Sequence, residues 1–346
     1  MIKVGVIGLG LMGQKRIGSI VTSGPECQLV AVCDVKREVA EKIAAQFSVR
    51  FYTDWEQMLA RDEMEALVIS TPNVFSAPIA LRACEKAIHL FCEKPLGLNS
   101  REAAIIYRAA QRKGIVLKVG FTLRFHPAIE EAWKRVQAGE IGRLLYGRAI
   151  YGHGGRPGYE QEWRASRRLA GGGELLDQGV HLIDLFRFFF GPVEEVFGLT
   201  PTLYWKMEVE DNAFAFLRTF AGQILMMQAS WTQWKNKFIF EIFGEKGYLL
   251  IDGLGGSYGP ETLILGLKKG NVPEEKRFSF PDPDKALIAE WQDFVAAVKG
   301  KKETRGSGWD GFMANFIVET LYESAREKKP ICLPPEEKLK EALFPE

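Results

Sequence analysis

The chain has 346 residues, of which 47% are hydrophobic and 26% charged, and its 45 Lys+Arg and 44 Asp+Glu leave a net charge of +1. This length and composition predict an ordinary globular protein of two domains. The balanced charge argues against a nucleic-acid-binding protein, and the lack of any run of ~18 apolar residues argues against a membrane span.

Residues 1–120 alternate between two kinds of segment. Short apolar runs predict strands, and segments rich in Ala, Glu and Lys predict helices. The predicted strands are Lys3–Ile7, Gln28–Cys33, Ala66–Ser70, His89–Cys92 and Val116–Gly120, and the predicted helices end near Ser23 or span Arg37–Phe47, Ala77–Lys86 and Ser100–Lys113. Repeated strand–helix units predict an α/β domain with a parallel sheet.

The pattern changes after Phe121, where we place the boundary between a first domain, residues 1–121, and a second, residues 122–346. A helix is predicted at Pro127–Ala138, and two more close the chain at Leu287–Val298 and Gly311–Lys328. Strands are predicted between them at Leu144–Tyr151, Asn212–Phe220, Gln223–Trp231, Lys237–Phe243 and Gly247–Ile251. Ala221-Gly222 predicts a hairpin turn, so the second domain is mainly strands.

A G-x-G-x-x-G sequence, Gly8, Gly10 and Gly13, follows the first strand directly and opens the first helix. Gly8 permits a tight turn, Gly10 lets a pyrophosphate approach the backbone, and Gly13 lets helix and strand pack closely. The pyrophosphate then meets the free N–H groups at the helix start. This context predicts a dinucleotide site rather than a merely structural glycine turn.

Asp34 ends the second predicted strand, about 20 residues beyond the glycines, where a carboxylate binds the ribose hydroxyls of the adenosine. A carboxylate repels a 2′-phosphate, so NAD is predicted and NADP is less favoured. Lys36 and Arg37 lie close by and could weaken that preference.

Glu93-Lys94-Pro95 follows the strand His89–Cys92. Ligands of open α/β sheets bind beyond the carboxyl ends of the strands, which predicts Lys94 near the nicotinamide end of a bound dinucleotide. The alternative is a surface lysine in a loop.

A second candidate site follows the triple glycine 171–173. On a helix, Asp177, His181 and Asp184 share one face, and a histidine flanked by carboxylates suits proton transfer near neutral pH. The neighbouring positions are apolar, so the helix is predicted to be buried and its polar groups to need partners. The alternative is a core histidine with structural partners.

The five cysteines, at 27, 33, 84, 92 and 332, show no C-x-x-C spacing, and no metal-ligand cluster is visible. This predicts free thiols in a reducing compartment and no metal site. The apolar N-terminal run stops at Gly8 and does not resemble a signal peptide, so we expect a cytoplasmic protein.

Taken together, these motifs resemble those of the glucose-fructose oxidoreductase / inositol dehydrogenase / MocA family. The resemblance rests on V-I-G-L-G-L-M-G at 6–13, Thr71-Pro72-Asn73, Glu93-Lys94-Pro95, Gly120-Phe121 with Arg124-Phe125, and G-G-G-x-x-x-D-x-G-x-H at 171–181. It implies a Rossmann domain followed by an α+β domain with a large, mainly antiparallel sheet. It also implies NAD(P)-dependent oxidation or reduction at a secondary alcohol or carbonyl of a sugar, cyclitol or related polyol.

The resemblance also implies roles for individual residues. Lys94, Asp177 and His181 would be catalytic. The cofactor would be bound by Gly8, Gly10, Leu11, Met12, Gly13, Asp34, Thr71, Pro72, Asn73, Glu93, Lys94, Trp163 and Arg164, and the substrate by Lys94, Arg124, His153, Tyr159, Asp177 and His181.

Two features depart from the family pattern. Thr122 stands where many relatives carry Asn, and Arg156, Arg164, Arg167 and Arg168 make one loop basic. The loop either favours an anionic substrate or is simply a solvated surface.

Two other functions are compatible with the resemblance. One is a glycosidase that uses NAD without net redox change, and the other is a regulator that senses the dinucleotide without catalysis. The aromatic residues Trp205, Trp231, Trp234, Phe238 and Phe240 lie in or near strands and predict either a homodimer or homotetramer interface or core packing.

Overall fold

The computed structural model describes residues 1–281 and 285–344. The chain forms two compact units, unit 1 (Met1–Thr122 with Ala286–Met313) and unit 2 (Leu123–Lys285 with Ala314–Glu346). The first break falls within a residue or two of the predicted boundary, but assigning all of 122–346 to the second domain was wrong, because 286–313 returns to unit 1. In the described part of the chain, no helix is long and apolar enough to cross a membrane.

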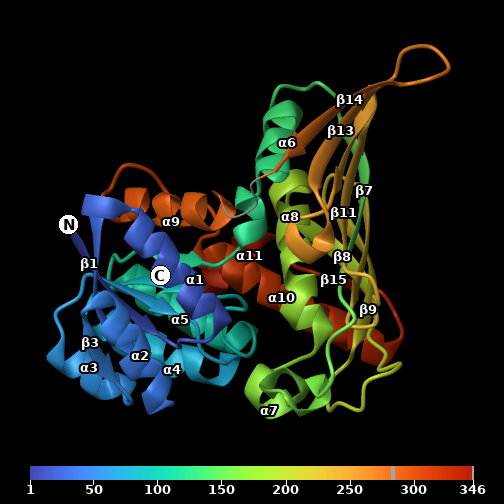
Figure 1. Ribbon diagram of the computed structural model, residues 1–346. Helices are drawn as coiled ribbons and strands as arrows, with labels where there is room; N and C mark the ends of the chain where they lie inside the picture. Colours follow the sequence, from blue (N-terminus) through green and yellow to red (C-terminus); the bar gives the residue numbers. More distant parts are fainter. Residues whose placement is uncertain (282–284, 345–346) are drawn as a thin grey trace. The chain divides into compact units, whose positions relative to one another are not determined.

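Unit 1 is built on a six-stranded parallel sheet in the order β3-β2-β1-β4-β5-β6 (Figure 1). Its strands are β1 Ile2–Ile7, β2 Cys27–Cys33, β3 Arg50–Tyr52, β4 Ala66–Ile69, β5 His89–Cys92 and β6 Leu117–Val119. Its helices are α1 Leu11–Thr22, α2 Arg37–Phe47, α3 Trp55–Arg61, α4 Ser76–Glu85, α5 Ser100–Arg112 and α9 Lys285–Val298. This strand order is that of a dinucleotide-binding Rossmann sheet.

Helix α9 belongs to unit 1 because its apolar face enters the core of the parallel sheet. Trp291 and Phe294 are buried, and their rings lie 5.9 Å and 5.7 Å from that of Phe91 on β5. Burial of aromatic side chains of this size stabilises a fold by about 1.5–3 kcal/mol each.

A buried ion pair ties α9 to β6. The Lys118 ammonium on β6 lies 3.0 Å from the Asp293 carboxylate, and both side chains are inaccessible to solvent. Burial by itself would raise the pKa of Asp293, but Lys118 and the hydrogen bonds of Lys302, Lys118 and Thr304 outweigh it and lower the pKa to about 2. The charged carboxylate therefore stabilises the folded state.

Replacing Asp293 with Asn is expected to lower the free energy of unfolding by about 3 kcal/mol at neutral pH, because Lys118 then keeps a buried charge without its partner. The folded pKa lies below the unfolded one, so the wild-type carboxylate stabilises above about pH 4 and loses this effect as the pH falls towards 2. Urea denaturation of wild type and D293N should give curves that converge in acid. A constant difference between them would contradict the assignment.

Unit 2 contains a nine-stranded, mainly antiparallel sheet in the order β14-β13-β12-β11-β7-β10-β9-β8-β15, in which only β7 and β10 run parallel. The strands are β7 Leu144–Gly152, β8 Val193–Leu199, β9 Asn212–Thr219, β10 Ile224–Ser230, β11 Lys237–Gly244, β12 Gly247–Asp252, β13 Glu261–Leu267, β14 Glu274–Phe280 and β15 Ile331–Cys332. The helices are α6 Pro127–Gln137, α7 Arg167–Ala170, α8 Val180–Phe190, α10 Gly308–Glu327, whose first residues belong to unit 1, and α11 Glu336–Leu343. The predicted hairpin turn joins β9 to β10, where Gly222 has a positive φ of 87°.

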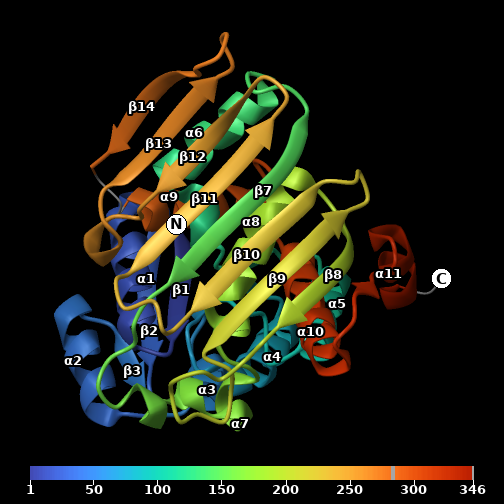
Figure 2. The same ribbon diagram turned by 90° about the vertical axis from the view of Figure 1, so that its right-hand side faces the viewer.

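The two faces of this sheet differ. Helices α6 and α8 lie behind it in Figure 2, whereas no helix of residues 1–281 and 285–344 covers the face turned toward the viewer. Strand β11 alternates, so that Phe238 and Phe240 are buried on the helix-covered side, and Trp231 after β10 is also fully buried. Of the two alternatives for the aromatic residues, core packing holds for these three, because the alternation of β11 turns Phe238 and Phe240 inward and Trp231 packs against Tyr159.

Candidate active site

The glycine turn of unit 1 has the geometry that its sequence predicts. Gly8 has a φ of +90°, and a Cβ there would lie 2.4 Å from the Ser70 carbonyl oxygen. A Cβ on Gly13 would lie 1.9 Å from the Gly8 carbonyl oxygen, so helix α1 can pack here only on glycine. Gly10, by contrast, has nothing within 4 Å of its Cβ position, and the next side chain, Leu11, is 75% exposed. The backbone is therefore closely packed at Gly8 and Gly13, and the space next to Gly10 is free.

Asp34 lies beside this turn at the carboxyl end of β2. Its Oδ2 accepts the N–H of Leu9 at 2.8 Å, and its Oδ1 accepts the N–H of Lys36 at 2.9 Å. These bonds fix the carboxylate next to the glycine turn, as binding of a ribose requires. Arg37 pairs with Glu41 at 2.8 Å, which reduces its availability for a 2′-phosphate.

The segment after β4 leaves a polar group for a ligand. The Thr71 hydroxyl is buried and has no hydrogen-bond partner within the described ranges 1–281 and 285–344. Pro72 and Asn73 follow it and begin the short helix 73–75. A buried hydroxyl without a partner costs free energy that a bound group can restore. Together with the open space at Gly10 and the fixed Asp34 carboxylate, it fits an NAD molecule along the carboxyl ends of β1, β2 and β4.

Glu93 and Lys94 follow β5 at the same edge of the sheet. Glu93 accepts a hydrogen bond from the buried Arg16 guanidinium at 2.6 Å, and Arg16 also pairs with Glu290 at 2.7 Å. Burial alone would lower the pKa of Arg16, but Glu290 and Glu93 raise it above its ordinary value. Arg16 lies on α1, so this network ties the glycine helix to the turn that carries Lys94.

In unit 2, Asp177 and His181 lie where a π-helix, Leu175–Gly179, continues into α8. π-helical turns are rare and occur frequently at functional sites. The Arg164 guanidinium lies 3.2 Å from the Asp177 carboxylate and 4.4 Å above the Trp163 ring. The predicted residues Trp163, Arg164 and Asp177 therefore form one cluster.

His181 is 8% exposed and lies beside a tyrosine of the sheet. Its ring is 6.1 Å from that of Tyr151 on β7, and Tyr151 is 5.5 Å from Tyr258. Gln178 donates to the Tyr258 hydroxyl at 3.3 Å. Burial raises the pKa of Tyr151 well above its ordinary value, so this phenol stays protonated beside the imidazole.

Asp184 does not join this cluster. Its carboxylate forms two hydrogen bonds with the buried Arg124 guanidinium, at 2.7 Å and 2.6 Å. The expectation that Asp184 flanks His181 in proton transfer is replaced by a structural ion pair. Because Arg124 is only 5% exposed, the pair also weighs against the predicted substrate contact of Arg124.

The two other substrate candidates differ from each other. Tyr159 is 2% exposed and packs edge-on against Trp205 and Trp231, which weighs against a substrate contact. His153 is half-buried, and its Nδ1 accepts the N–H of Gly155 at 2.9 Å. Burial lowers the pKa of His153, so its ring is neutral at pH 7 and its Nε2 carries the hydrogen.

Carboxylates pair with two of the four arginines of the basic loop, and a backbone carbonyl accepts from a third. Arg156 binds Glu162 through two hydrogen bonds of 2.7 Å, and Arg167 donates to the Glu208 carbonyl at 2.9 Å. With Arg164 paired to Asp177, three of the four arginines already have acceptors, which favours the solvated-loop interpretation.

Two domain models of one family match this chain. The oxidoreductase family with an NAD-binding Rossmann fold matches residues 2–121, and the GFO/IDH/MocA C-terminal domain matches residues 129–250. The chain belongs to the GFO/IDH/MocA family of oxidoreductases. The predicted family, the Rossmann fold with its NAD cofactor and the mainly antiparallel second sheet are confirmed.

Relatives within the GFO/IDH/MocA family cover nearly the whole chain. Levoglucosan dehydrogenase of Pseudarthrobacter phenanthrenivorans is 27% identical, covering 96% of this chain and 98% of its own. Myo-inositol 2-dehydrogenase of Thermotoga maritima is 28% identical over 96% of this chain and 98% of its own. Scyllo-inositol 2-dehydrogenase (NAD(+)) of Bacillus subtilis is 27% identical over 87% of each chain.

A solved structure of levoglucosan dehydrogenase in complex with NADH and L-sorbose shares the fold of this GFO/IDH/MocA chain. It superposes with a TM-score of 0.89 at 24% identity and covers 96% of this chain and 99% of its own.

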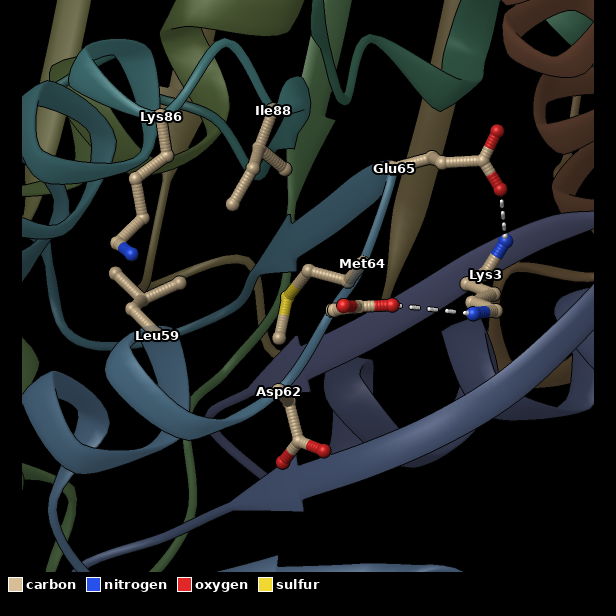
Figure 3. A pocket seen from close by; sticks show the side chains of 8 residues that line it. Lys3, Leu59, Asp62, Met64, Glu65, Lys86 and Ile88 are labelled. Atoms are coloured by element: carbon tan, nitrogen blue, oxygen red, sulfur yellow. Dashed lines mark hydrogen bonds and ion pairs between the residues drawn. The ribbon is translucent and has the colours of Figure 1, made fainter.

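One open depression in unit 1 lies at the opposite edge of the parallel sheet. Figure 3 shows Lys3, Asp62, Glu65 and Ile88 around it, at the amino ends of β1, β4 and β5. The glycine turn and Lys94 of this GFO/IDH/MocA chain follow the carboxyl ends of the same strands, so the depression is not the dinucleotide site. Within the described residues, no group of His, Cys, Asp or Glu side chains could hold a metal ion.

Sequence reasoning missed Arg16, Tyr151, Gln178 and Tyr258. Arg16 looks like one more cation on an amphipathic helix, and only its partners at 93 and 290 reveal its burial. Gln178 adjoins Asp177 in the family motif, which is a signal that could have found it. Tyr151 lies in strand β7, where aromatic residues are common for packing alone, and Tyr258 lies in the short helix 256–258.

Proposed function

We propose that the protein is an NAD-dependent dehydrogenase that oxidises, or in reverse reduces, a secondary alcohol or carbonyl of a sugar or cyclitol. The observation that carries this proposal is that unit 1 has an open glycine turn beside the fixed Asp34 carboxylate, while unit 2 has Asp177 and His181 where a π-helix continues into α8. The relatives named above act on levoglucosan and on inositols, which are ring polyols without formal charge. The carboxylate pairs of Arg156 and Arg164 agree with an uncharged substrate of this class.

In this proposal His181 accepts the proton of the substrate hydroxyl. The Lys94 ammonium donates a hydrogen bond to the same oxygen and stabilises its developing negative charge. Asp177 orients the substrate or the imidazole. NAD, when bound, supplies the acceptor for the hydride that leaves the carbinol carbon. The alternative is that a neutral Lys94 amine accepts the proton and His181 donates the hydrogen bond.

The test is the near-ultraviolet absorbance of NADH, with purified protein, NAD or NADP, and a panel of anhydrosugars, inositols, sugar acids and nucleotide sugars. Turnover with NAD and a neutral ring polyol is the expected result. NAD binding without absorbance change on any compound would overturn the dehydrogenase proposal. Release of sugar from a glycoside would then show redox-neutral cleavage, and no release would show a sensor.

We propose that two or more copies of the chain associate through the helix-free face of the nine-stranded sheet. Phe214, Phe216, Ile224 and Tyr146 are exposed there on β9, β10 and β7, and Ile224 is the pairing partner of Tyr146. The charges between them are paired within the chain, such as Arg148 with Glu241 on β11. A large apolar face with neutralised charges suits a second copy of itself about a two-fold axis.

Replacing Phe216 with Lys is expected to convert a dimer or tetramer into monomer, because a charge at the centre of a buried apolar interface loses its hydration. Analytical ultracentrifugation measures the change. Val272→Lys is the matched control, since Val272 is 75% exposed but lies in the turn between β13 and β14. A monomeric wild type, or an F216K variant with unchanged mass, would refute self-association through this face.

We also propose a reducing, cytoplasmic location. Cys27, Cys33, Cys84 and Cys92 are buried free thiols, and Cys332 is an exposed one. Free thiols persist where the compartment keeps cysteines reduced. Fractionation of the native host with a cytoplasmic marker tests the location.

A further inference from the structure

The carboxylate of Glu210 lies at the start of the helical segment that carries the catalytic pair. It accepts the N–H of Gly173 at 3.1 Å on each oxygen and the N–H of Leu175 at 3.1 Å. The Glu210 carbonyl accepts the N–H of Glu174 at 3.1 Å. The start of a helix leaves such N–H groups without partners of their own, and here three consecutive ones all bond to a single residue.

Tyr322 on α10 completes this arrangement. Its hydroxyl donates to Glu210 Oε1 at 2.7 Å. Burial, reinforced by the charge of Glu210, raises the pKa of Tyr322 well above its ordinary value, so the phenol keeps the proton that it donates. We call Glu210 and Tyr322 the glycine clamp.

The clamp explains why residues 172 and 173, just before the π-helix, are glycines. A Cβ on Gly173 would lie 2.0 Å from the Glu210 carbonyl oxygen, and one on Gly172 would lie 2.2 Å from the Tyr322 hydroxyl. Neither distance is possible for real atoms. The close approach of the clamp therefore requires these two glycines.

The clamp is joined directly to the catalytic segment. The carbonyl of Gly173 accepts the N–H of Asp177 at 2.9 Å and that of Leu176 at 3.1 Å. One residue, Gly173, is thus bound on its N–H side by Glu210 and on its carbonyl side by Asp177. A π-helical turn is less favourable than a regular α-helix and needs fixed surroundings to persist.

We propose that Glu210 and Tyr322 are positioning residues that hold the π-helix in register and so set the placement of Asp177 and His181. This role rests on the proposed function, because the consequence for catalysis depends on that pair. A cap that merely stabilised the fold would leave turnover per folded molecule unchanged.

The experiment compares Glu210→Gln with Glu208→Gln. Glu208 is a matched control because its carboxylate accepts the N–H of Arg167 at 2.9 Å, at the start of another helix, α7, whereas the N–H groups of 173–175 all bond to Glu210. Glutamine at 210 replaces one of the two accepting oxygens with an N–H₂ group, which cannot accept a hydrogen bond from the backbone N–H donors. For E210Q we expect kcat to fall about 10- to 100-fold, KM for NAD to stay unchanged and the pH profile of kcat to shift. E208Q should match wild type. An E210Q enzyme with the kcat and pH profile of E208Q would overturn the proposal.

Tyr322→Phe serves as a milder variant if E210Q does not fold, because it removes only one oxygen atom. It should lower kcat in the same direction by a smaller factor. Hydrogen exchange of the amides of 173–181 supplies a readout that does not depend on turnover, and exchange should be faster in Y322F than in E208Q. If wild type turns over no compound of the panel, the proposed function fails. Hydrogen exchange of the amides of 173–181 still tests whether the clamp holds the π-helix. Unchanged exchange in Y322F would then overturn it.

Discussion

Replacing His181 with alanine is expected to lower kcat by about 10²–10⁴-fold, the usual contribution of a positioned general base. The buried imidazole lies in unit 2 beside Tyr151, whose raised pKa keeps the phenol protonated and so unsuited to take over as the base. NAD binding depends on residues of unit 1, so its Kd should stay within about twofold. Steady-state rates and a fluorescence titration with NADH measure the two quantities.

The pH dependence of the same variant distinguishes the two candidate bases. If His181 is the base, the H181A enzyme loses the limb of the profile on which the rate rises with pH, whereas Lys94→Met keeps it at a lower rate. If Lys94 is the base, the Lys94→Met enzyme loses the rising limb, whereas H181A keeps it at a lower rate. Near wild-type turnover in H181A would remove His181 from the mechanism altogether.

The parallel sheet could be predicted from sequence because its signals are local. Strands β1, β2, β4 and β5 are short apolar runs followed by helices, so their alternation predicts the sheet. Strand β3, R-F-Y, and helix α3 were missed, because both are short and β3 has no apolar run. The return of α9 could not be predicted in this way. Its sequence shows a helix with an apolar face, but only the contact of Trp291 and Phe294 with Phe91 shows which core that face enters.

Strands at the edge of the second sheet were missed for a related reason. β14 has the sequence E-E-K-R-F-S-F and most of it is exposed, so it lacks the alternation that marks a half-buried strand. Charged edge strands protect a sheet from pairing with other chains, which hides them from pattern reasoning.

The predicted site residues divide according to whether their partners are near in sequence. The glycine turn is set by contacts within one strand–turn–helix unit and with the next strand, and Gly8 and Gly13 are as tightly packed as the motif predicts. Asp184 was assigned to the catalytic face from helical spacing. Its partner Arg124 lies far away in the sequence, and spacing along one helix carries no information about it.

Replacing Gly10 with valine is expected to weaken NAD binding about 100-fold or more, which corresponds to roughly 2.8 kcal/mol, without unfolding the protein. The backbone of Gly10 has φ −66° and ψ −170°, an extended conformation open to any residue, and its Cβ would contact nothing within 4 Å. The side chain would instead occupy the space that a pyrophosphate needs above the start of α1.

Gly18→Val is the matched control for G10V, because Gly18 lies on the same helix and its Cβ position is equally free of contacts. Both variants should melt close to wild type, and only G10V should lose NADH binding in a fluorescence or calorimetric titration. An unchanged Kd in G10V would mean that the dinucleotide does not cross this turn. Equal losses in G10V and G18V would mean that a bulkier α1, and not a blocked pyrophosphate site, causes the effect. The comparison thus tests the cofactor placement independently of any substrate.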